Sequence, residues 1–439
     1  MPKQKSEIAT RQERRQLGRA CRNKAGRPEQ AKWDPASRKF DVAELLLHSQ
    51  RGRIRELLPI KWAHMKTSPF GFFRGAVPVM AADLAPMPRT GLMAQICGDA
   101  HVQNLGAFEA PDGRLIFDIN DFDETIVGPW EWDVKRMSAS LVLAGREAGN
   151  SDKDCRNAVL AFAGNYRLCM HRFSEMAFVD LARFQIYREL GCVQTVLRKA
   201  ERATPLHNLE KLTYLRGGKH IFHDRKPMQF HISDKEAEVA KSSLVDYTHS
   251  LLPERAHFFR QYRVEDVAFR VVGTGSVGLR DYVLLMFGGA VSDPLFMQIK
   301  EEPGSAYAPY LPHSPVASHQ GQRTAEGGRA MQMQSDLFLG WTSIEGRHYV
   351  VRQLRDHKAA IEEGDLRKQG LVEYAKMCGE LLSKGHARSG DPCAIAGYLG
   401  NNNKFDGAMA NFGVLYADQT NKDWEAFKRA MRNGKTSAA

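Results

Sequence analysis

The sequence predicts an α+β fold in which a mainly helical part comes first and a β-rich part follows. Residues 133–200 place apolar side chains at the i, i+3, i+4 spacing of helices. Residues 268–302 instead read as strands separated by Gly-containing turns and a loop. The pattern changes from helical to strand-like near 255–265, where we place the boundary between the two parts. A length of 439 residues suits two lobes, and a hydrophobic content of 43% is enough for a sizeable core.

The helical part has several elements before its long helices. Residues 41–66 carry a helical pattern, and SPFGFFRG at 68–75 reads as a tight connection because Pro and Gly interrupt it. LMAQIC at 92–97 predicts a short buried strand. RLIFDIN at 114–120 alternates like a strand and runs into a carboxylate cluster. Residues 201–260 are polar and give no clear pattern.

The β-rich part continues after its first three strands with a helix expected at 320–335. LFLGWT (337–342) and RHYVVRQL (347–354) predict two more strands, and 367–388 predicts a helix with further helices behind it. We therefore divide the chain into a basic flexible arm (1–40), a helical lobe (41–260), a β-rich lobe (261–356) and C-terminal helices that return to the helical lobe (357–439); the motifs below lead us to expect the catalytic loop and metal-binding acids in the helical lobe and nucleotide binding in the β-rich lobe.

Composition narrows the class of protein. The formal net charge is +11, and residues 1–40 hold 12 Lys/Arg against 4 Asp/Glu, so most of the excess lies in the arm. A solvated tail explains this charge; contact of the arm with nucleic acid is the alternative, without a recognisable nucleic-acid-binding motif to support it. Seven scattered cysteines without a CxxC pair favour a reducing compartment. No secretory signal or bilayer-length apolar stretch is present, so we expect a cytoplasmic protein with no membrane partner.

The first motif with chemical content is GDAHVQN, residues 98–104. Phosphoryl transfer needs a carboxylate that orients the attacking hydroxyl and oxygen ligands for Mg²⁺. Asp99, followed five residues later by Asn104 on a loop after a strand, supplies both. The same residues also serve as caps of local turns, which is the structural alternative.

The second motif is FDINDFDE, residues 117–124, with four carboxylates in seven residues. These carboxylates repel one another unless a cation lies among them. Asp121 and Asp123 share one face of an extended chain. An acidic surface turn is the alternative, but the apolar neighbours place the cluster in the expected core, where buried carboxylates require compensation.

The third and fourth motifs lie in the β-rich part. G-T-G-S-V-G at 273–278 matches G-x-G-x-x-G, and a strand rather than a helix follows it, as in the Gly-rich hairpin of kinases. A plain hairpin turn is the alternative. Lys300 ends the apolar run LFMQIK, and a Lys there can hold phosphates when a helical Glu pairs with it. Glu326 is the candidate partner.

Together these pieces resemble an aminoglycoside-phosphotransferase-type kinase. That family's catalytic loop reads G-D-x-H-x-x-N, which residues 98–104 match, and a strand ending in I-D-F or I-D-W follows, as in N-Asp121-Phe122. Asp133 in WEWDVKR matches the family's later Asp. The extra acids at Asp118 and Asp123 depart from the family, so Asp118 stays open as the true metal ligand.

The order of the motifs departs from that of ordinary kinases, in which the Gly-rich loop and the Lys precede the catalytic loop. Here they follow it, and residues 371–388 resemble the long helix that normally leads into the catalytic loop. This order is typical of a circular permutation. The resemblance therefore implies a two-lobed protein-kinase-like fold, circularly permuted, with the C-lobe-like part first and the N-lobe-like part second.

Over about residues 33–430 the chain also resembles a bacterial family, the domain of unknown function numbered 2252. The blocks SPFGFFRG, CGDAHVQNLG, FDINDFDE, GPWEWDVKR, VVGTGSVG and YVVRQLRD carry this resemblance. It implies a family without implying a substrate.

The kinase resemblance implies an ATP- and Mg²⁺-dependent phosphotransferase acting on an unknown acceptor. Asp99 is then the catalytic Asp that accepts the proton of the acceptor hydroxyl, with His101 holding its loop, and Asp133 ties the loop to the next helix. The metal ligands are Asn104 and Asp121, with Asp118 open. The implied nucleotide-binding residues are Gly273, Gly275, Ser276, Gly278, Lys300 and Glu326.

Two other functions stay open at this point. A metal-dependent hydrolase would use Asp99, His101, Asp118, Asp121 and Asp123 on one or two metal ions. It explains the acids but gives the Gly-rich loop and Lys300 no role. A non-catalytic, pseudokinase-like module that only binds nucleotide is the third possibility.

Overall fold

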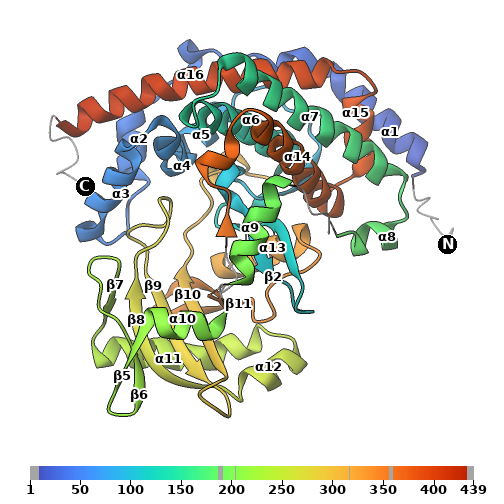
Figure 1. The fold of residues 1–439 in the computed structure, drawn as a ribbon. Helices are drawn as coiled ribbons and strands as arrows, with labels where there is room; N and C mark the ends of the chain where they lie inside the picture. The colour runs from blue at the N-terminus through green and yellow to red at the C-terminus, as the bar shows by residue number, and fades with distance from the viewer. Residues whose placement is uncertain (1–8, 186–190, 203, 316, 355–358, 433–439) are drawn as a thin grey trace, which may run out of the picture.

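The structure is a computed structural model, and it describes residues 9–185, 191–202, 204–315, 317–354 and 359–432. Helices from both ends of the chain pack at one end of the molecule, and a twisted sheet with its covering helices lies at the other (Figure 1). The mixed α+β class is as the sequence predicts. Within the described residues, no helix combines the length and hydropathy needed to cross a lipid bilayer.

The helical part is built around three long helices and two small sheets. Helices α6 (Trp130–Glu147), α7 (Asp152–Glu175) and α14 (Gln369–Ser389) pack on one another and bury most of their apolar side chains. The remaining elements of this part before residue 205 are α1 (Arg11–Ala20), α2 (Val42–His48), α3 (Leu58–Lys66), α4 (Pro69–Gly75), α5 (Val77–Leu84), β1 (Met93–Ile96), β2 (Leu105–Glu109), β3 (Leu115–Ile119), β4 (Ile126–Pro129), α8 (Phe178–Arg183) and α9 (Gly191–Glu201).

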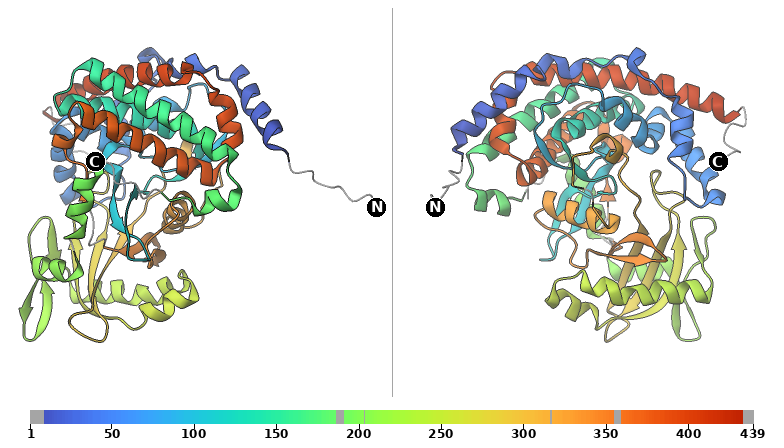
Figure 2. Two further views of the ribbon diagram at one scale, coloured as in Figure 1. Left: turned by 45° about the vertical axis from the view of Figure 1, so that its right-hand side comes forward. Right: turned by 180° about the vertical axis from the view of Figure 1, so that it is seen from behind.

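The chain returns to this part at its end. Helices α15 (Pro392–Leu399) and α16 (Lys404–Arg432) complete it, and β13 (Ala359–Ala360) adds a third strand to the β2–β3 hairpin. Figure 2 shows α1, from the start of the chain, beside α15 from its end. The helix expected at 367–388 is thus confirmed as α14, and it packs against α6, α7 and β1 of the first part.

The β-rich part is a six-stranded antiparallel sheet in the order β11-β12-β10-β9-β8-β7. Its strands are β7 (Gln229–His231), β8 (Arg263–Arg270), β9 (Asp281–Phe287), β10 (Pro294–Glu301), β11 (Gly340–Ile344) and β12 (Arg347–Gln353). The Gly-rich segment 273–278 joins the neighbouring strands β8 and β9, as the sequence predicts. The helix expected at 320–335 is α13 (Gln320–Met331), which packs on β11 and β12.

The two faces of this sheet differ. On β10, Leu295, Met297 and Ile299 point to one face, which α11 (Asp234–His249) and α12 (Pro253–Phe259) cover. The alternate residues point to the other face, where α10 (Pro205–Leu212) and the hairpin β5 (Thr213–Arg216)–β6 (Lys219–Phe222) cover its apolar half. The polar half, with Gln298 and Lys300, faces the helical part.

Two sequence-based expectations need correction, and a third lies outside the described residues. The β-rich part begins near residue 205, because β7 is a strand of its sheet and α10, β6, α11 and α12 pack on that sheet, so the boundary at 255–265 is wrong. The segment 68–75 is the helix α4, capped by Ser68 and begun by Pro69, and not a tight connection. The boundary placed at 356/357 falls on 355–358, which lie outside the described residues.

The basic arm also differs from expectation from residue 9 onward. Helix α1 begins with a capping box formed by Thr10 and Glu13 and packs closely on α15, so that a side chain at Gly18 would overlap the Ala394 backbone. Arg22 and Arg27 donate to the last carbonyls of α15. The charges of Arg22 and Arg27 therefore stabilise the C-terminus of α15, so this part of the arm is not a solvated tail. Residues 1–8 lie outside the described residues.

Candidate functional site

The loop that carries Asp99 is fixed by buried hydrogen bonds from the helices behind it. The backbone amides of Cys97 and Gly98 donate to the two Asp133 carboxylate oxygens at 2.8 and 2.9 Å. His386 of α14 lies 3.2 Å from the same carboxylate. Gly98 has φ +78° and lies so close to the Glu124 carbonyl that no side chain fits there. Asp133 therefore ties this loop to α6, as the sequence predicts.

Asp99 is oriented by a buried arginine. The Arg136 Nε, from α6, donates to Asp99 Oδ1 at 2.6 Å, and the same guanidinium stacks on Phe73 at 4.2 Å. The other carboxylate oxygen lies 3.7 Å from His101 Nε2. Burial raises the pKa of Asp99, and Arg136 and Arg74 partly offset that rise. The result is a carboxylate with one oxygen held by protein and one directed toward the cavity side of the loop.

His101 and Asn104 keep this loop in shape. His101 is buried, its Nδ1 accepts a hydrogen bond from the Gln103 amide, and burial with two nearby arginines lowers its pKa. A neutral His101 suits loop support rather than proton transfer. Asn104 Nδ2 donates to the Asp99 carbonyl at 2.6 Å, so the Asn104 side-chain oxygen is left for a cation.

Asp118 does not belong to the cavity. Its carboxylate is fully buried, forms an ion pair with Lys384 of α14 and accepts a hydrogen bond from the Ile119 amide. Alternation along β3 turns this side chain toward α14, whereas Asp121 follows the end of the strand. The assignment of Asp118 as a metal ligand is therefore wrong, and its charge is already neutralised by Lys384.

Asp121 and Asp123 lie where the two parts of the chain meet. Asp123 forms an ion pair with Lys300 of β10, and Ser276 of the Gly-rich segment donates to the same carboxylate at 3.2 Å. Burial would raise the pKa of Asp123, but Lys300 and Arg352 hold it below its usual range. Asp121 accepts only the Asp123 amide, at 3.3 Å, among the described residues, and forms no ion pair with them. Its pKa is raised by burial and by Asp123.

The buried Glu beside Lys300 is Glu302, not Glu326. Glu302 lies 4.0 Å from Lys300 and accepts a hydrogen bond from Thr324 of α13. Glu326 is on the exposed face of α13 and pairs with Gln322, so its assignment to the nucleotide site is wrong. The helix is coupled to the acidic loop by Arg323, which donates to the carbonyls of Asp123 and Thr125.

Two basic residues near the start of the helical part fix the Gly-rich segment by hydrogen bonds to its backbone carbonyls. Arg53 donates to the carbonyls of Gly275 and Val277 at 2.8 and 2.7 Å, and Lys61 donates to Gly275 at 3.1 Å. Gly273 and Gly278 have φ +71° and +90°, values that favour glycine. With these carbonyls turned toward Arg53 and Lys61, the segment lies over the acidic loop.

These elements enclose a narrow cavity of about 70 Å³. It brings together most of the residues expected from the sequence. Its lining includes Asp99, His101, Asn104, Asp121, Asp123, Glu124, Gly273, Gly275, Ser276, Arg53 and Arg74. Gly278 and Lys300 flank it without lining it, since Gly278 hydrogen-bonds Ile54 and Lys300 reaches Asp123. Arg74 also enters it, and its buried Nε has no hydrogen-bond partner among the described residues.

Sequence reasoning did not identify Arg53, Lys61, Arg74 and Arg136. Arg74 and Arg136 stand in the blocks FGFFRG and WEWDVKR, where a charge inside a strongly apolar run was the available signal. Arg53 and Lys61 meet the Gly-rich segment from more than 200 positions away in the sequence, and nothing local indicates that contact.

The donor set fits a divalent cation bound together with phosphate groups. Asp121 forms no ion pair with the described residues, although Lys300 and Arg352 lie close enough to lower its pKa, and Asn104 lines the same cavity. Two hard oxygen donors suit Mg²⁺, which takes its other ligands from phosphates and water. Among the described residues, no three His, Cys, Asp or Glu side chains gather closely enough to hold a metal on their own.

Comparison with known proteins gives one match. The family model described as "Uncharacterized protein conserved in bacteria (DUF2252)" matches residues 53–430. Neither a curated protein nor a solved structure matches the chain.

Proposed function

Because this chain belongs to the DUF2252 family, whose description states no activity, we propose its function from its own site. The protein is an ATP- and Mg²⁺-dependent phosphotransferase with a kinase-like, circularly permuted fold. Its acceptor is a hydroxyl-bearing molecule whose identity the site does not specify. This function gives a role to the acidic residues, the Gly-rich segment and Lys300 together.

The observation that carries this proposal is the meeting of three distant segments at Asp123. Lys300 of β10 and Ser276 of the Gly-rich segment both bind its carboxylate, and Asp121 lies two residues away. Phosphoryl transfer requires this combination, because a lysine, a metal-binding carboxylate and a glycine-rich backbone must all reach one triphosphate. A plain hairpin turn or an acidic surface loop would need none of these contacts.

The arrangement of elements supports the permuted order. A sheet with a Gly-rich turn between β8 and β9, a lysine on β10 and a helix packed on β11 and β12 matches the kinase pattern. Helix α14 ends beside β1, where Ser389 contacts Gln95, just ahead of the Asp99 loop. An unpermuted kinase has its long helix at the same place, leading into the catalytic loop.

Each residue has a defined task in this proposal. Asp99, oriented by Arg136, accepts the proton of the acceptor hydroxyl and directs its oxygen toward the phosphoryl group. Asn104 and Asp121 would hold Mg²⁺, which supplies neutralisation of the phosphate charge when it is bound. Lys300 exchanges Asp123 for a phosphate oxygen, and the Gly-rich segment covers the phosphates.

The hydrolase alternative fits the site less well. It requires Asp99, His101, Asp118, Asp121 and Asp123 to share one or two metal ions. Asp118 is paired with Lys384, Asp99 with Arg136, and Asp123 with Lys300. Three of the four carboxylates that this hydrolase needs are therefore already paired with a cation of the protein. Accordingly, no three His, Cys, Asp or Glu side chains among the described residues lie close enough together to hold a metal ion.

The test is a pair of measurements on wild type and Asp99→Asn. Wild type should bind Mg²⁺·ATP, seen as a raised melting temperature, and should transfer the γ-phosphate of labelled ATP to an acceptor in a metabolite library. Asp99→Asn should abolish transfer and keep nucleotide affinity within a few-fold, because this carboxylate acts on the acceptor. Loss of nucleotide binding in Asp99→Asn would make Asp99 a metal ligand and favour the hydrolase. Mg²⁺·ATP binding with no turnover in wild type would favour a pseudokinase-like module.

A further inference from the structure

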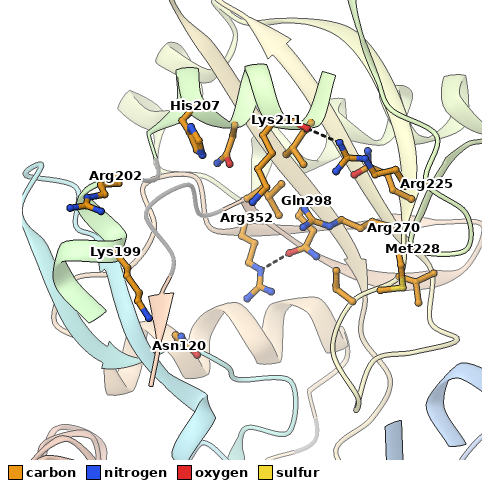
Figure 3. Close-up of a pocket in the computed structure, with 16 residues that line it drawn as sticks. Asn120, Lys199, Arg202, His207, Lys211, Arg225, Met228, Arg270, Gln298 and Arg352 are labelled. Carbon is orange, nitrogen blue, oxygen red and sulfur yellow. Dashed lines mark hydrogen bonds between the residues drawn. The ribbon is translucent and has the colours of Figure 1, made fainter. Parts of the chain in front are cut away.

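A second, larger cavity of about 580 Å³ lies between the two parts of the chain (Figure 3). Its lining carries six cationic side chains and one histidine. They are Lys199, Arg202, Lys211, Arg225, Arg270, Arg352 and His207. Figure 3 shows these side chains on both sides of the hollow, with Arg352 between them. None of the described lining residues is Asp or Glu.

The positive charge of this cavity is only partly balanced by the protein. Lys199 pairs with Glu362 at 2.6 Å, while Arg225 donates to the Lys211 backbone carbonyl. Arg202 and Lys211 form no ion pair within the described residues, and Arg270 forms none either but is attracted by Asp281 on the same sheet face. Like charges gathered in a concave site repel one another and attract anions strongly. Binding of a negatively charged ligand in this cavity would therefore relieve the repulsion among these side chains and lower the free energy of the folded state.

A neutral donor points into the same space. Asn120 is 4% exposed, lines the cavity, and its Nδ2 has no hydrogen-bond partner among the described residues. A buried amide donor without a partner is costly, and a phosphate oxygen would satisfy it. Asn120 directly precedes Asp121, which lines the proposed phosphate site, so the two cavities are neighbours.

Arg352 connects the two sites. Alternation across the paired strands puts Arg270, Asp281, Gln298, Lys300 and Arg352 on the same sheet face. Arg352 donates to Gln298 at 2.9 Å, and its pKa is raised, against the effect of burial, by the carboxylates of the acidic loop. A ligand in this cavity thus lies next to the phosphates that Lys300 would hold.

We propose that this cavity binds a multiply phosphorylated small molecule, with a cluster of at least two phosphate groups. The inference deepens the proposed function, on which it rests for treating that molecule as a substrate. A volume of about 580 Å³ suits a small ligand. Side chains from α9, α10, β8 and β12 line a concave hollow that is open to solvent on one side. Nucleic acid is typically held along a longer basic surface or groove. An uncharged nucleobase bound in this cavity would leave the cationic side chains without anionic partners.

The test uses inorganic tripolyphosphate as the probe and the full chain as the protein. Wild type should bind it at 0.15 M salt in calorimetry. Lys211→Glu with Arg225→Glu should weaken binding at least tenfold, because two exposed rim cations become repulsive. The matched control, Lys235→Glu with Arg260→Glu, reverses two exposed charges on α11 and beside α12, away from the cavity, and should change affinity less than twofold. Absence of binding in wild type, or equal weakening in both double variants, would overturn the proposal.

Further arms identify the source of the phosphates. Tripolyphosphate that still binds in saturating Mg²⁺·ATP analogue indicates a separate phosphorylated acceptor; mutual exclusion indicates one nucleotide that carries extra phosphates into this cavity. A single-stranded oligonucleotide that binds more tightly than tripolyphosphate, with affinity rising with length, would overturn the small-molecule assignment. Lys300→Met should abolish Mg²⁺·ATP binding and leave tripolyphosphate binding intact. If wild type bound tripolyphosphate at the cavity but never Mg²⁺·ATP, the proposed function would fail and the cavity would stand.

Discussion

Lys300 and Asp123 form an ion pair although 177 positions separate them in the sequence, with the Lys300 side chain buried and that of Asp123 24% exposed. Lys300 comes from the middle of the six-stranded sheet and Asp123 from the loop after β3, so the pair joins the β-rich part to the helical part. Both charges are largely removed from water. Their pairing joins the two sides of the site, and under the proposed function the phosphate oxygens of a nucleotide would replace Asp123 as the partner of Lys300.

Lys300→Met should lower stability and remove nucleotide binding together. It leaves Asp123 and Glu302 buried without their ammonium partner, which costs roughly 3 kcal/mol or more. The matched control is Lys241→Met on α11, whose pair with Glu238 is partly exposed, with a change of about 1 kcal/mol or less. Chemical denaturation measures both values. Equal effects of the two substitutions would show that the Lys300 pair is not a buried one in solution.

Asp118→Asn and Asp121→Asn should separate structural from ligand-binding carboxylates. Asp118→Asn leaves Lys384 fully buried without a counter-charge, a loss of roughly 3 kcal/mol. Its Mg²⁺·ATP thermal shift, taken from its own lower baseline, should persist. Asp121→Asn removes one of two neighbouring carboxylates, so its melting temperature should hold or rise while the Mg²⁺·ATP shift disappears. The reverse pattern would return the ligand role to Asp118.

Most of the helices and strands followed from pattern alone, because their apolar periodicity agrees with their final burial. Long helices such as α7 and α14, and strands such as β9, repeat apolar residues at the period of their structure. The segment 201–260 gave no clear pattern in its strands because β5, β6 and β7 bury only one side chain each. Its membership of the sheet depends on tertiary contacts that no local signal reports.

The site residues that belong to short continuous motifs could be predicted from the sequence. The residues that contact them from distant parts of the chain could not. Asp99, Asn104 and Asp121 follow from short motifs. The choice of Glu326 failed because the rotation of α13 about its axis leaves Glu326 exposed. Glu302, which directly follows β10, meets Lys300 instead. The assignment of Asp118 as a metal ligand failed because its ion-pair partner, Lys384, is 266 positions away in the sequence.

Arg74→Ala should reduce turnover far more than nucleotide affinity. Its guanidinium lies in the Asp99 cavity with a buried Nε that no described residue satisfies, a position suited to charge that develops on the transferred phosphoryl group. We expect kcat to fall by roughly 10²-fold, with partial recovery in Arg74→Lys. The control is Arg263→Ala at the exposed start of β8. Unchanged kcat in correctly folded Arg74→Ala would contradict this role.

Asp281 provides a pH-dependent test of the polar sheet face. It is 3% exposed and accepts two hydrogen bonds from Gln298 at 3.0 and 2.7 Å. Burial raises its pKa to about 6, against the attraction of Lys300 and Arg270. The folded state therefore binds this proton more tightly than the unfolded state does. The favourable contribution of the protonated form is complete below the unfolded pKa and is lost as the pH rises through about 6.

Asp281→Asn should remove this dependence, because the amide stays neutral and still accepts from Gln298. Relative to wild type, the variant should gain stability between about pH 4 and pH 6 and keep a constant advantage above pH 7. The pKa difference sets an upper limit on that advantage of about 3 kcal/mol. Denaturant titrations of both proteins from pH 4 to 8 measure the difference, in which all other titrating groups cancel. A difference that does not change with pH would mean that Asp281 titrates at its ordinary pKa, and a variant that loses stability as the pH rises would mean that Lys300 and Arg270 depend on its negative charge.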